Sequence, residues 1–281
     1  MITLCHTIAD TRQVIEEKKQ AGESIGFVPT MGALHEGHLA LVRRAASEND
    51  FVVVSIFVNP IQFNNAEDLA NYPRTLDDDL KKLEGTGCDL VFAPSADEMY
   101  PEPDTTVFDF GHLDKVMEGK FRPGHFEGVA IVVKKLFEIV VPHRAYFGEK
   151  DFQQLAIIKK MVDLEQMPIE LVSCPIVREA DGLAMSSRNM RLNEVEREEA
   201  TLIFKSLSGI SENYSWVTPE GVKQIVSGQI NESPLFRVEY VEVVDGETLR
   251  PFEDWMDVEH AVVCVAAFIG PVRLIDNWRL F

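Results

Sequence analysis

The segment PTMGALHEGH, residues 29–38, places two histidines and two glycines directly after the apolar run IGFV. His35 and His38 lie at positions i and i+3, so they share one face of the first turn if a helix begins here. That turn carries backbone N–H groups without helical partners and the positive end of the helix dipole, which together bind phosphate. Either histidine alone could instead be a capping or packed side chain. The pair predicts a phosphate-binding turn.

Spacing excludes two well-known motifs for this segment. The zinc-protease pattern HExxH places its histidines four residues apart, whereas HEGH places them three apart. A Walker-type phosphate loop, GxxxxGK[ST], does not occur in the chain. The segment therefore indicates a phosphate site of another kind.

Three other segments offer polar side chains that suit an anionic or hydroxylated ligand. In GEKDFQQ, Lys150 can place a point charge on a phosphate, and Gln154 follows at i+4 on the expected helix. In MSSRN, two hydroxyls and a guanidinium follow an expected Asp181–Gly182 turn and suit a polyphosphate. In NPIQF, the neutral amide of Gln62 suits hydroxyl or carboxylate oxygens. Taken singly, each has an ordinary alternative as surface charge or loop composition.

Three consecutive acids, Asp77, Asp78 and Asp79, could bind a cation. Acidic residues are also favoured in the first turn of a helix by its dipole, and we prefer this interpretation. Thr75 is expected to cap that helix through its hydroxyl, with Asp78 completing a capping box. We therefore assign no metal ligand.

The composition disfavours several classes of function. The chain of 281 residues has 46 acids and 27 bases, a formal charge of −19, which argues against nucleic acid and anionic membranes as partners. No apolar run approaches the ~20 residues that cross a bilayer, and the amino-terminal residues do not resemble a secretory signal. The four cysteines, Cys5, Cys88, Cys174 and Cys264, form no CxxC pair. We expect reduced thiols and a cytoplasmic protein.

Apolar runs and periodic segments predict the elements that must position these residues. The expected buried strands are at 25–28, 51–57, 89–92, 144–147 and 169–177. Helical patterns separate them, the clearest at 127–141. Strands that alternate with helices indicate an α/β fold with a doubly wound parallel sheet.

Beyond residue 182 the pattern changes to that of a small α+β domain. Its expected elements are helices at 193–207 and 217–228, then strands at 236–244, 261–269 and 272–275. In the first of these strands, Phe236, Val238 and Tyr240 alternate with polar residues, which predicts one core face and one face toward water. We therefore expect two domains, residues 1–182 and residues 183–281.

The polar segments share a position in the expected fold. Ligands of an open α/β sheet bind outside the carboxyl ends of its strands. PTMGALHEGH, NPIQF, GEKDFQQ and READGLAMSSRN each follow an expected strand, while FRPGHFEG leads into the helix at 127–141. We expect these distant segments to meet at one edge of the sheet and to form a small cationic site in an acidic chain.

With these segments in order, the chain resembles the pantothenate synthetase (pantoate–β-alanine ligase) family. PTMGALHEGH, FVNPIQF, FRPGHFEGV, YFGEKDFQQ and MSSRN match that family's motifs across most of residues 25–190. HEGH corresponds to the HIGH motif of the wider adenylyl-transferring superfamily, and MSSRN stands where relatives carry KMSKS. Ile61 and Phe152 replace the Met and Tyr that are common in the family.

The resemblance implies a Rossmann-like N-terminal domain, a smaller C-terminal domain, and usually a homodimer. We expect the READGLAMSSRN segment and the small domain to close as a lid over a reactive adenylate. The resemblance also implies the ATP-dependent condensation of (R)-pantoate with β-alanine to pantothenate through a pantoyl-adenylate. Mg²⁺ would accompany ATP, and AMP and diphosphate would be released.

By motif position, the resemblance assigns residues to these ligands. It implies that Gln62 and Gln154 hold pantoate, with Gln62 also near β-alanine, and that His38 is a proton donor. The remaining catalytic candidates are His35, Lys150, Ser186, Ser187 and Arg188. The implied ATP-binding residues are Met31, Gly32, Ala33, Leu34, His35, Glu36, Gly37, His38, Gly148, Glu149, Lys150, Asp151, Val177, Met185, Ser186, Ser187 and Arg188.

Two other functions compete with this interpretation. A related nucleotidyl transferase with a phosphorylated acceptor would need basic residues in the acceptor pocket, whereas the chain offers two glutamines. A non-catalytic nucleotide-binding protein should lack one of the histidine, lysine or serine–arginine elements, and all of them are present. The sequence therefore favours the ligase.

Overall fold

The computed structural model describes residues 2–211 and 214–281. The chain divides into two compact units. The first extends to Glu149 and includes Gln154–Pro175, and the second comprises Lys150–Gln153 and Ile176–Phe281. Among the described residues, no helix combines the length and the apolar character that crossing a bilayer requires.

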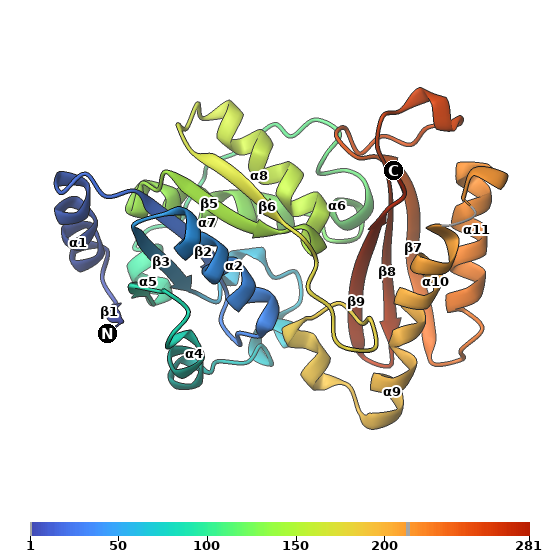
Figure 1. Cartoon of the computed structure of the whole chain (residues 1–281), viewed down its shortest axis with the longest axis horizontal. Coiled ribbons are helices and arrows are strands. Elements are labelled where there is room, and N and C mark those ends of the chain that lie inside the picture. Colours follow the sequence, from blue (N-terminus) through green and yellow to red (C-terminus); the bar gives the residue numbers. More distant parts are fainter. Residues whose placement is uncertain (1, 212–213) are drawn as a thin grey trace. The chain divides into compact units, whose positions relative to one another are not determined.

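The first unit is built on a six-stranded parallel sheet (Figure 1). Its strands are β1 (Thr3–Cys5), β2 (Ile25–Thr30), β3 (Phe51–Ile56), β4 (Leu90–Phe92), β5 (Arg144–Gly148) and β6 (Glu170–Cys174). They lie in the order β1-β4-β3-β2-β5-β6. The prediction of a doubly wound parallel sheet is confirmed, and each expected strand lies within a few residues of an observed one. Only β1 was not predicted, because a strand this short shows no periodicity.

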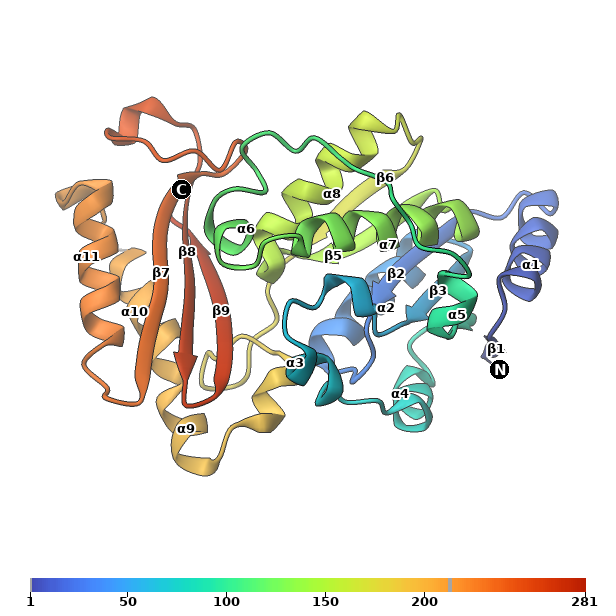
Figure 2. The same cartoon turned by 180° about the vertical axis from the view of Figure 1, so that it is seen from behind.

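Helices cover both faces of this sheet. The helices that begin before residue 153 are α1 (Ile8–Gln20), α2 (Glu36–Glu48), α3 (Ala66–Ala70), α4 (Leu76–Leu83), α5 (Ala96–Met99), α6 (Met117–Phe121), α7 (His125–Val140) and α8 (Phe152–Leu164). One face packs against α1, α7 and α8, and the other packs against α2 and α4 (Figures 1 and 2). Because both faces are buried, neighbouring residues such as Phe27 and Val28 enter different cores, and the central strands are continuous apolar runs.

The start of α4 differs from the prediction. Thr75 is the N-cap residue of α4, but its side chain makes no capping bond, and no capping box with Asp78 forms. The Thr75 hydroxyl instead donates to the carboxylate of Asp79, 3.1 Å away. The buried acceptor Asp79 competes for that hydroxyl, so the predicted cap was wrong.

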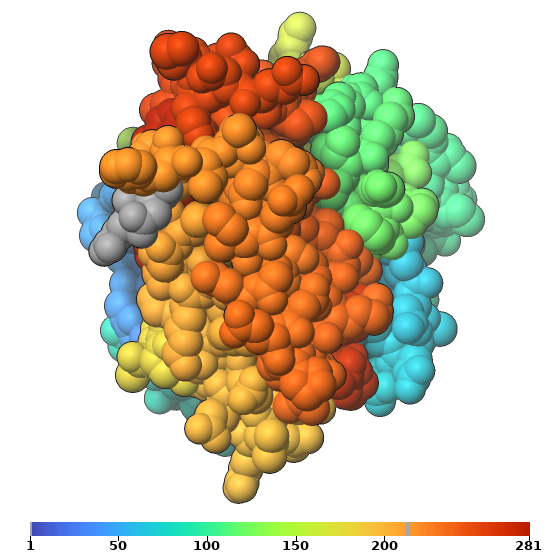
Figure 3. All heavy atoms as spheres, turned by 90° about the vertical axis from the view of Figure 1, so that its right-hand side faces the viewer, coloured from blue at the N-terminus to red at the C-terminus, as the bar shows by residue number. Residues whose placement is uncertain are grey.

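The second unit contains a three-stranded antiparallel sheet in the order β7-β8-β9. Its strands and helices are β7 (Phe236–Asp245), β8 (Ala261–Ile269), β9 (Val272–Arg279), α9 (Glu194–Glu199), α10 (Thr201–Ser211) and α11 (Pro219–Ile230). α10 and α11 pack on the sheet through one apolar core, and Figure 3 shows their outer surface in orange. The predicted small α+β fold is confirmed. The single helix expected at 193–207 is in fact α9 and α10, which meet at the buried Ala200.

The expected alternation along β7 holds only at its start. The register with β8 shifts between Val238 and Tyr240, which marks a β-bulge. Glu239 does not face water as predicted: its side chain is 14 % exposed and its carboxylate lies 2.6 Å from the guanidinium of Arg273. A bulge changes which side chains share a face, and the apolar pattern alone does not reveal it.

Candidate functional site

The centre of the large sheet is a topological switch point. β2 lies between β3 and β5. From β2 the chain proceeds through β3 to β4 on one side, and it later returns to β5 on the other side. Because the strands are parallel, the segments that follow β2, β3 and β5 leave the same edge of the sheet. This edge is where open α/β sheets bind ligands, as we expected for these three segments.

The segment after β2 is held by a buried carboxylate. Asp79 of α4 is fully buried, and its two oxygens accept the N–H groups of Ala33 at 2.9 Å and Leu34 at 2.7 Å. The Lys82 ammonium donates to the Leu34 carbonyl over 2.7 Å. Asp79 therefore positions the backbone that leads into α2. This contact agrees with the interpretation of the acidic run as part of a helix start.

The two histidines lie side by side at the start of α2. His35 is the N-cap residue, and the centroids of the His35 and His38 rings are 4.1 Å apart. The His35 N–H donates to Nδ1 of His38 over 3.3 Å. Because Nδ1 of His38 is an acceptor, the proton of the neutral ring is on Nε2. His38 can therefore offer an N–H donor beside the first turn of the helix.

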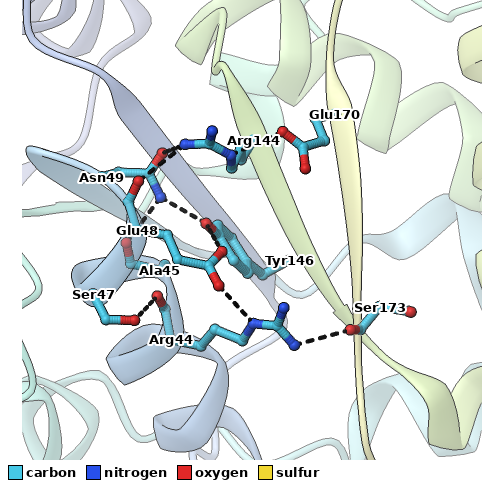
Figure 4. A network of polar contacts seen from close by, with 9 residues as sticks. All are labelled: Arg44, Ala45, Ser47, Glu48, Asn49, Arg144, Tyr146, Glu170 and Ser173. Carbon is cyan, nitrogen blue, oxygen red and sulfur yellow. Dashed lines mark hydrogen bonds and ion pairs between the residues drawn. The ribbon is translucent and has the colours of Figure 1, made fainter.

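The other end of α2 is anchored to the sheet by a polar network (Figure 4). The hydroxyl of the buried Tyr146 on β5 donates to Glu48 over 2.9 Å and accepts from Asn49 over 2.7 Å. Arg44 donates to the Glu48 carboxylate, and Arg144 donates to the Glu48 carbonyl. Hydrogen bonds from Tyr146 and Arg44 lower the pKa of Glu48, while burial raises the pKa of Tyr146 to about 12. Both ends of α2 are thus fixed.

Gln62, in the 3-10 turn Pro60–Gln62 after β3, is 8 % exposed and held on several sides. Its Oε1 accepts from Asn59 over 3.0 Å, its carbonyl lies 2.8 Å from Nδ1 of His125, and its Nε2 lies 3.0 Å from Sδ of Met31. A Cβ on Gly128 would come within 2.8 Å of the Gln62 Cα. The start of α7 therefore packs directly against this turn, and the structure brings the candidates Gln62 and Met31 together.

Some of these contacts were missed at the level of sequence. Asn59, His125 and Gly128 lie inside the motif segments without a predicted role, and Asp79 was predicted only as part of a helix start. The motif match of NPIQF and FRPGHFEGV was the signal that could have paired them. Tyr100, described below, lies outside every motif, and no sequence signal pointed to it.

Lys150 lies in the second unit, in the 3-10 turn Glu149–Asp151 before α8. Its ammonium is 3.5 Å from Asp151, its side chain is 18 % exposed, and its carbonyl accepts the Asn277 side-chain amide over 3.0 Å. Gln154 lies on α8 itself. The expectation that Lys150 and Gln154 share a face of one α-helix was therefore wrong, because the chain enters α8 through a tighter turn.

Within the second unit, residues 177–188 form a loop that is anchored through Arg178. Arg178 pairs with Asp276 through two hydrogen bonds of 2.6 and 3.0 Å, and its guanidinium lies over the rings of Phe204 and Trp278. Burial raises the pKa of Asp276, and the Arg178 charge opposes that shift. Gly182 has a φ of +92°, which confirms the predicted turn at this glycine. Arg178 thus anchors the segment that carries the serine and arginine candidates.

The candidates at the end of this segment start a short 3-10 helix, Ser187–Arg191. The Met185 N–H donates to the Val177 carbonyl over 3.0 Å, so these two candidates are adjacent. The Ser186 hydroxyl accepts the Arg188 N–H over 3.3 Å. The hydroxyls of Ser186 and Ser187 and the guanidinium of Arg188 therefore belong to a hydrogen-bonded helix start.

The remaining candidates fall on the same two units. In the first unit, the ATP-binding candidates are Met31 to His38 between β2 and α2, Gly148 at the end of β5, and Glu149 directly after it. In the second unit, they are Lys150, Asp151, Val177, Met185, Ser186, Ser187 and Arg188.

A doubly wound parallel sheet whose switch point carries a histidine-bearing helix start defines a nucleotide-binding α/β enzyme. Residues 3–279 match the family model described as pantoate–β-alanine ligase. The chain therefore belongs to the pantoate–β-alanine ligase family.

Individual relatives agree with this assignment. A pantothenate synthetase of Bacteroides fragilis is 54 % identical over 272 residues, which cover 97 % of this chain and 96 % of that protein. The crystal structure of pantothenate synthetase from Thermus thermophilus matches with a TM-score of 0.93 and 44 % identity, over 100 % of both chains. The pantoate-beta-alanine ligase from Francisella tularensis, complexed with beta-gamma ATP and beta-alanine, matches with a TM-score of 0.83 and 34 % identity, over 100 % of this chain and 98 % of that one.

Proposed function

We propose that the chain condenses (R)-pantoate with β-alanine in a reaction driven by ATP, with pantothenate, AMP and diphosphate as products. The pantoate carboxylate attacks the α-phosphorus of ATP and displaces diphosphate, which leaves a pantoyl-adenylate. The amine of β-alanine then attacks the acyl carbon, and AMP departs. Family membership supports this reaction, as does the relative that holds ATP and β-alanine.

The observation that carries the proposal is the arrangement at the carboxyl ends of β2 and β3. The first turn of α2, which follows the N-cap residue His35 and contains His38, is suited to the phosphates of ATP. Gln62, which contacts Met31 at the start of the same segment, is suited to the oxygens of pantoate. An acid bound at Gln62 would lie next to the nucleotide, as in-line attack requires.

The site must offset the repulsion between a carboxylate and a polyphosphate in a chain with a charge of −19. We assign this task to the N–H donor of His38, to Lys150 and Arg188, and to the hydroxyls of Ser186 and Ser187. Such donors stabilise the charge that moves onto diphosphate as the α-phosphorus changes partners. No side-chain nucleophile is needed, because the substrate carboxylate attacks directly.

Mg²⁺ is expected to accompany ATP. Within residues 2–211 and 214–281, no group of three or more His, Cys, Asp or Glu side chains is arranged to hold a metal ion. Asp79 uses its carboxylate oxygens for backbone N–H groups. Mg²⁺ commonly binds through substrate phosphates and retains waters. We infer that it arrives on the ATP phosphates, and no step above depends on a metal held by the protein.

Three further properties complete the proposal. We expect a homodimer, a cytoplasmic location, and closure of the C-terminal part, residues 183–281, over the reactive adenylate. Closure would protect the adenylate from hydrolysis. Sedimentation analysis of the purified chain tests the first of these.

An isotope-exchange assay tests the adenylate mechanism. With pantoate present and β-alanine absent, labelled diphosphate should enter ATP, and omission of pantoate should abolish the exchange. His38→Ala and Lys150→Ala should each lower the exchange rate by about 10²–10³-fold while the melting temperature stays near that of the wild type. Absence of pantoate-dependent exchange in the wild type would exclude the mechanism, and near-normal rates in both variants would place the site elsewhere.

A further inference from the structure

The Gln62 side chain belongs to a series of hydrogen bonds that reaches Tyr100. Tyr100 follows α5 as its C-cap residue, and its hydroxyl donates to Oδ1 of Asn59 over 2.8 Å. Asn59 is 1 % exposed, and its Nδ2 donates to Oε1 of Gln62 and to the Gly128 carbonyl, each over 3.0 Å. All of these residues belong to the first unit. The end of α5 and the start of α7 are thus connected to a substrate-binding candidate.

Two contacts determine which end of the Asn59 amide is the oxygen. The Gly128 carbonyl can only accept, so it must face the NH₂ group. The Tyr100 hydroxyl faces the opposite end and therefore donates to the oxygen. A tyrosine hydroxyl is protonated at neutral pH, and burial raises the pKa of Tyr100 further, so it remains a donor. Both N–H groups of Asn59 are thereby directed, one to Gly128 and the other to Gln62.

The orientation of Asn59 determines the orientation of Gln62. Because Asn59 is the donor, Gln62 turns Oε1 toward it and Nε2 away from it. Nε2 lies 3.0 Å from Sδ of Met31, and a thioether is a weak acceptor. On the Met31 side, Gln62 therefore offers N–H donors, which suit a carboxylate or hydroxyl oxygen. A reversed amide would place its own oxygen against a carboxylate oxygen, which cannot donate, and would repel it.

We propose that Tyr100 is a positioning residue: together with the Gly128 carbonyl, it holds the Asn59 amide in the direction that makes Gln62 donate to an oxygen of pantoate. This inference rests on the proposed role of Gln62 in binding pantoate. It explains why a side chain outside the motifs is connected to this turn by a buried asparagine.

The test compares Tyr100→Phe with Tyr214→Phe. Tyr100→Phe removes the hydroxyl and keeps the ring, whose centroid lies 6.2 Å from that of Phe57. Tyr214→Phe removes a hydroxyl from an aromatic cluster of the second unit, where Tyr214 packs against Trp255 and Phe281. We expect Tyr100→Phe to raise the KM for pantoate about fivefold and to leave the KM for ATP unchanged. Tyr214→Phe should change neither value.

A second measurement does not depend on turnover. The side-chain N–H resonances of Gln62, identified by their loss in Gln62→Glu, should shift in Tyr100→Phe and stay in place in Tyr214→Phe. Unmoved resonances, or an unchanged KM for pantoate in Tyr100→Phe, would overturn the proposal. If the wild type released no diphosphate with pantoate, the proposed function would fail, and the resonances would still decide the role of Tyr100.

Discussion

One buried carboxylate organises the segment that we assign to phosphate binding. Ala33 adopts a φ of +50°, a conformation that non-glycine residues seldom take. Asp79 holds this backbone by accepting the N–H groups of Ala33 and Leu34. Hydrogen bonds to a charged acceptor are stronger than neutral ones, so they offset the strain. The geometry before His35 therefore depends on a residue that touches no proposed substrate.

Asp79→Asn should lower the free energy of unfolding by about 2 kcal/mol, because an NH₂ group would then face a backbone N–H donor. The KM for ATP should rise in the same variant, since the turn loses its support. Asp78→Asn is the matched control: Asp78 is exposed and pairs only at the surface with Lys81, 3.0 Å away. Urea unfolding and initial rates check both values, and equal stability of the two variants would contradict the role of Asp79.

At the scale of elements, α2 is a 13-residue helix held at both ends. Asp79 and Lys82 hold the backbone before its first turn, and the Tyr146 network holds Glu48 in its last turn. Because a helix behaves as a short rigid rod, anchoring its last turn also fixes where His35 and His38 lie. The sheet therefore positions the candidate site from a distance.

Tyr146→Phe should lower the melting temperature by about 2–3 °C, because it removes the hydroxyl that donates to Glu48 and accepts from Asn49, at a net cost of about 1 kcal/mol. Glu36→Gln tests an exposed pair on the same helix, where Glu36 and Arg43 lie 2.9 Å apart with both side chains about half exposed. Such surface pairs add little to stability, so we expect almost no shift. Calorimetry measures the melting temperatures of both variants. A larger decrease for Glu36→Gln than for Tyr146→Phe would contradict the role of Tyr146 in anchoring α2.

For the whole molecule, stability at low pH depends on carboxyl groups whose pKa the fold lowers. Hydrogen bonds from Thr106, together with Lys135, lower the pKa of Asp104 to about 2 from an ordinary value of 3.8. A carboxyl with a lowered pKa in the folded state stabilises the fold while it is charged. That contribution is complete well above pH 3.8 and is lost as the pH falls through about 2.

Asp104→Asn should therefore be less stable than the wild type at pH 6, and the difference should narrow as the pH falls from 5 to 3. Asp163→Asn, a change at an exposed acid of α8, should show no such convergence. Denaturant unfolding at several pH values gives the difference directly. A gap between wild type and Asp104→Asn that stays constant down to pH 3 would mean that Asp104 acts through packing instead of charge.

Local patterns were enough to predict most elements and the order of the motifs. The apolar runs at β2 and β3 indicated buried strands because both faces of a parallel sheet are covered. Local patterns failed where a competing side chain or a change of strand register intervenes. Thr75 bonds to Asp79 instead of capping α4, and a bulge in β7 turns Glu239 toward Arg273.

The sequence by itself determined the fold class, the family and the residue types that meet nucleotide and acid, because periodicity and motif spacing are local properties of the chain. Only the tertiary structure decided how those residues are held. Asp79 and Ala33 are 46 positions apart, Tyr100 and Asn59 are 41 apart, and His125 and Gln62 are 63 apart. Contacts between such distant residues form only when the strands pair and the helices pack on them, because sheet pairing brings distant segments together.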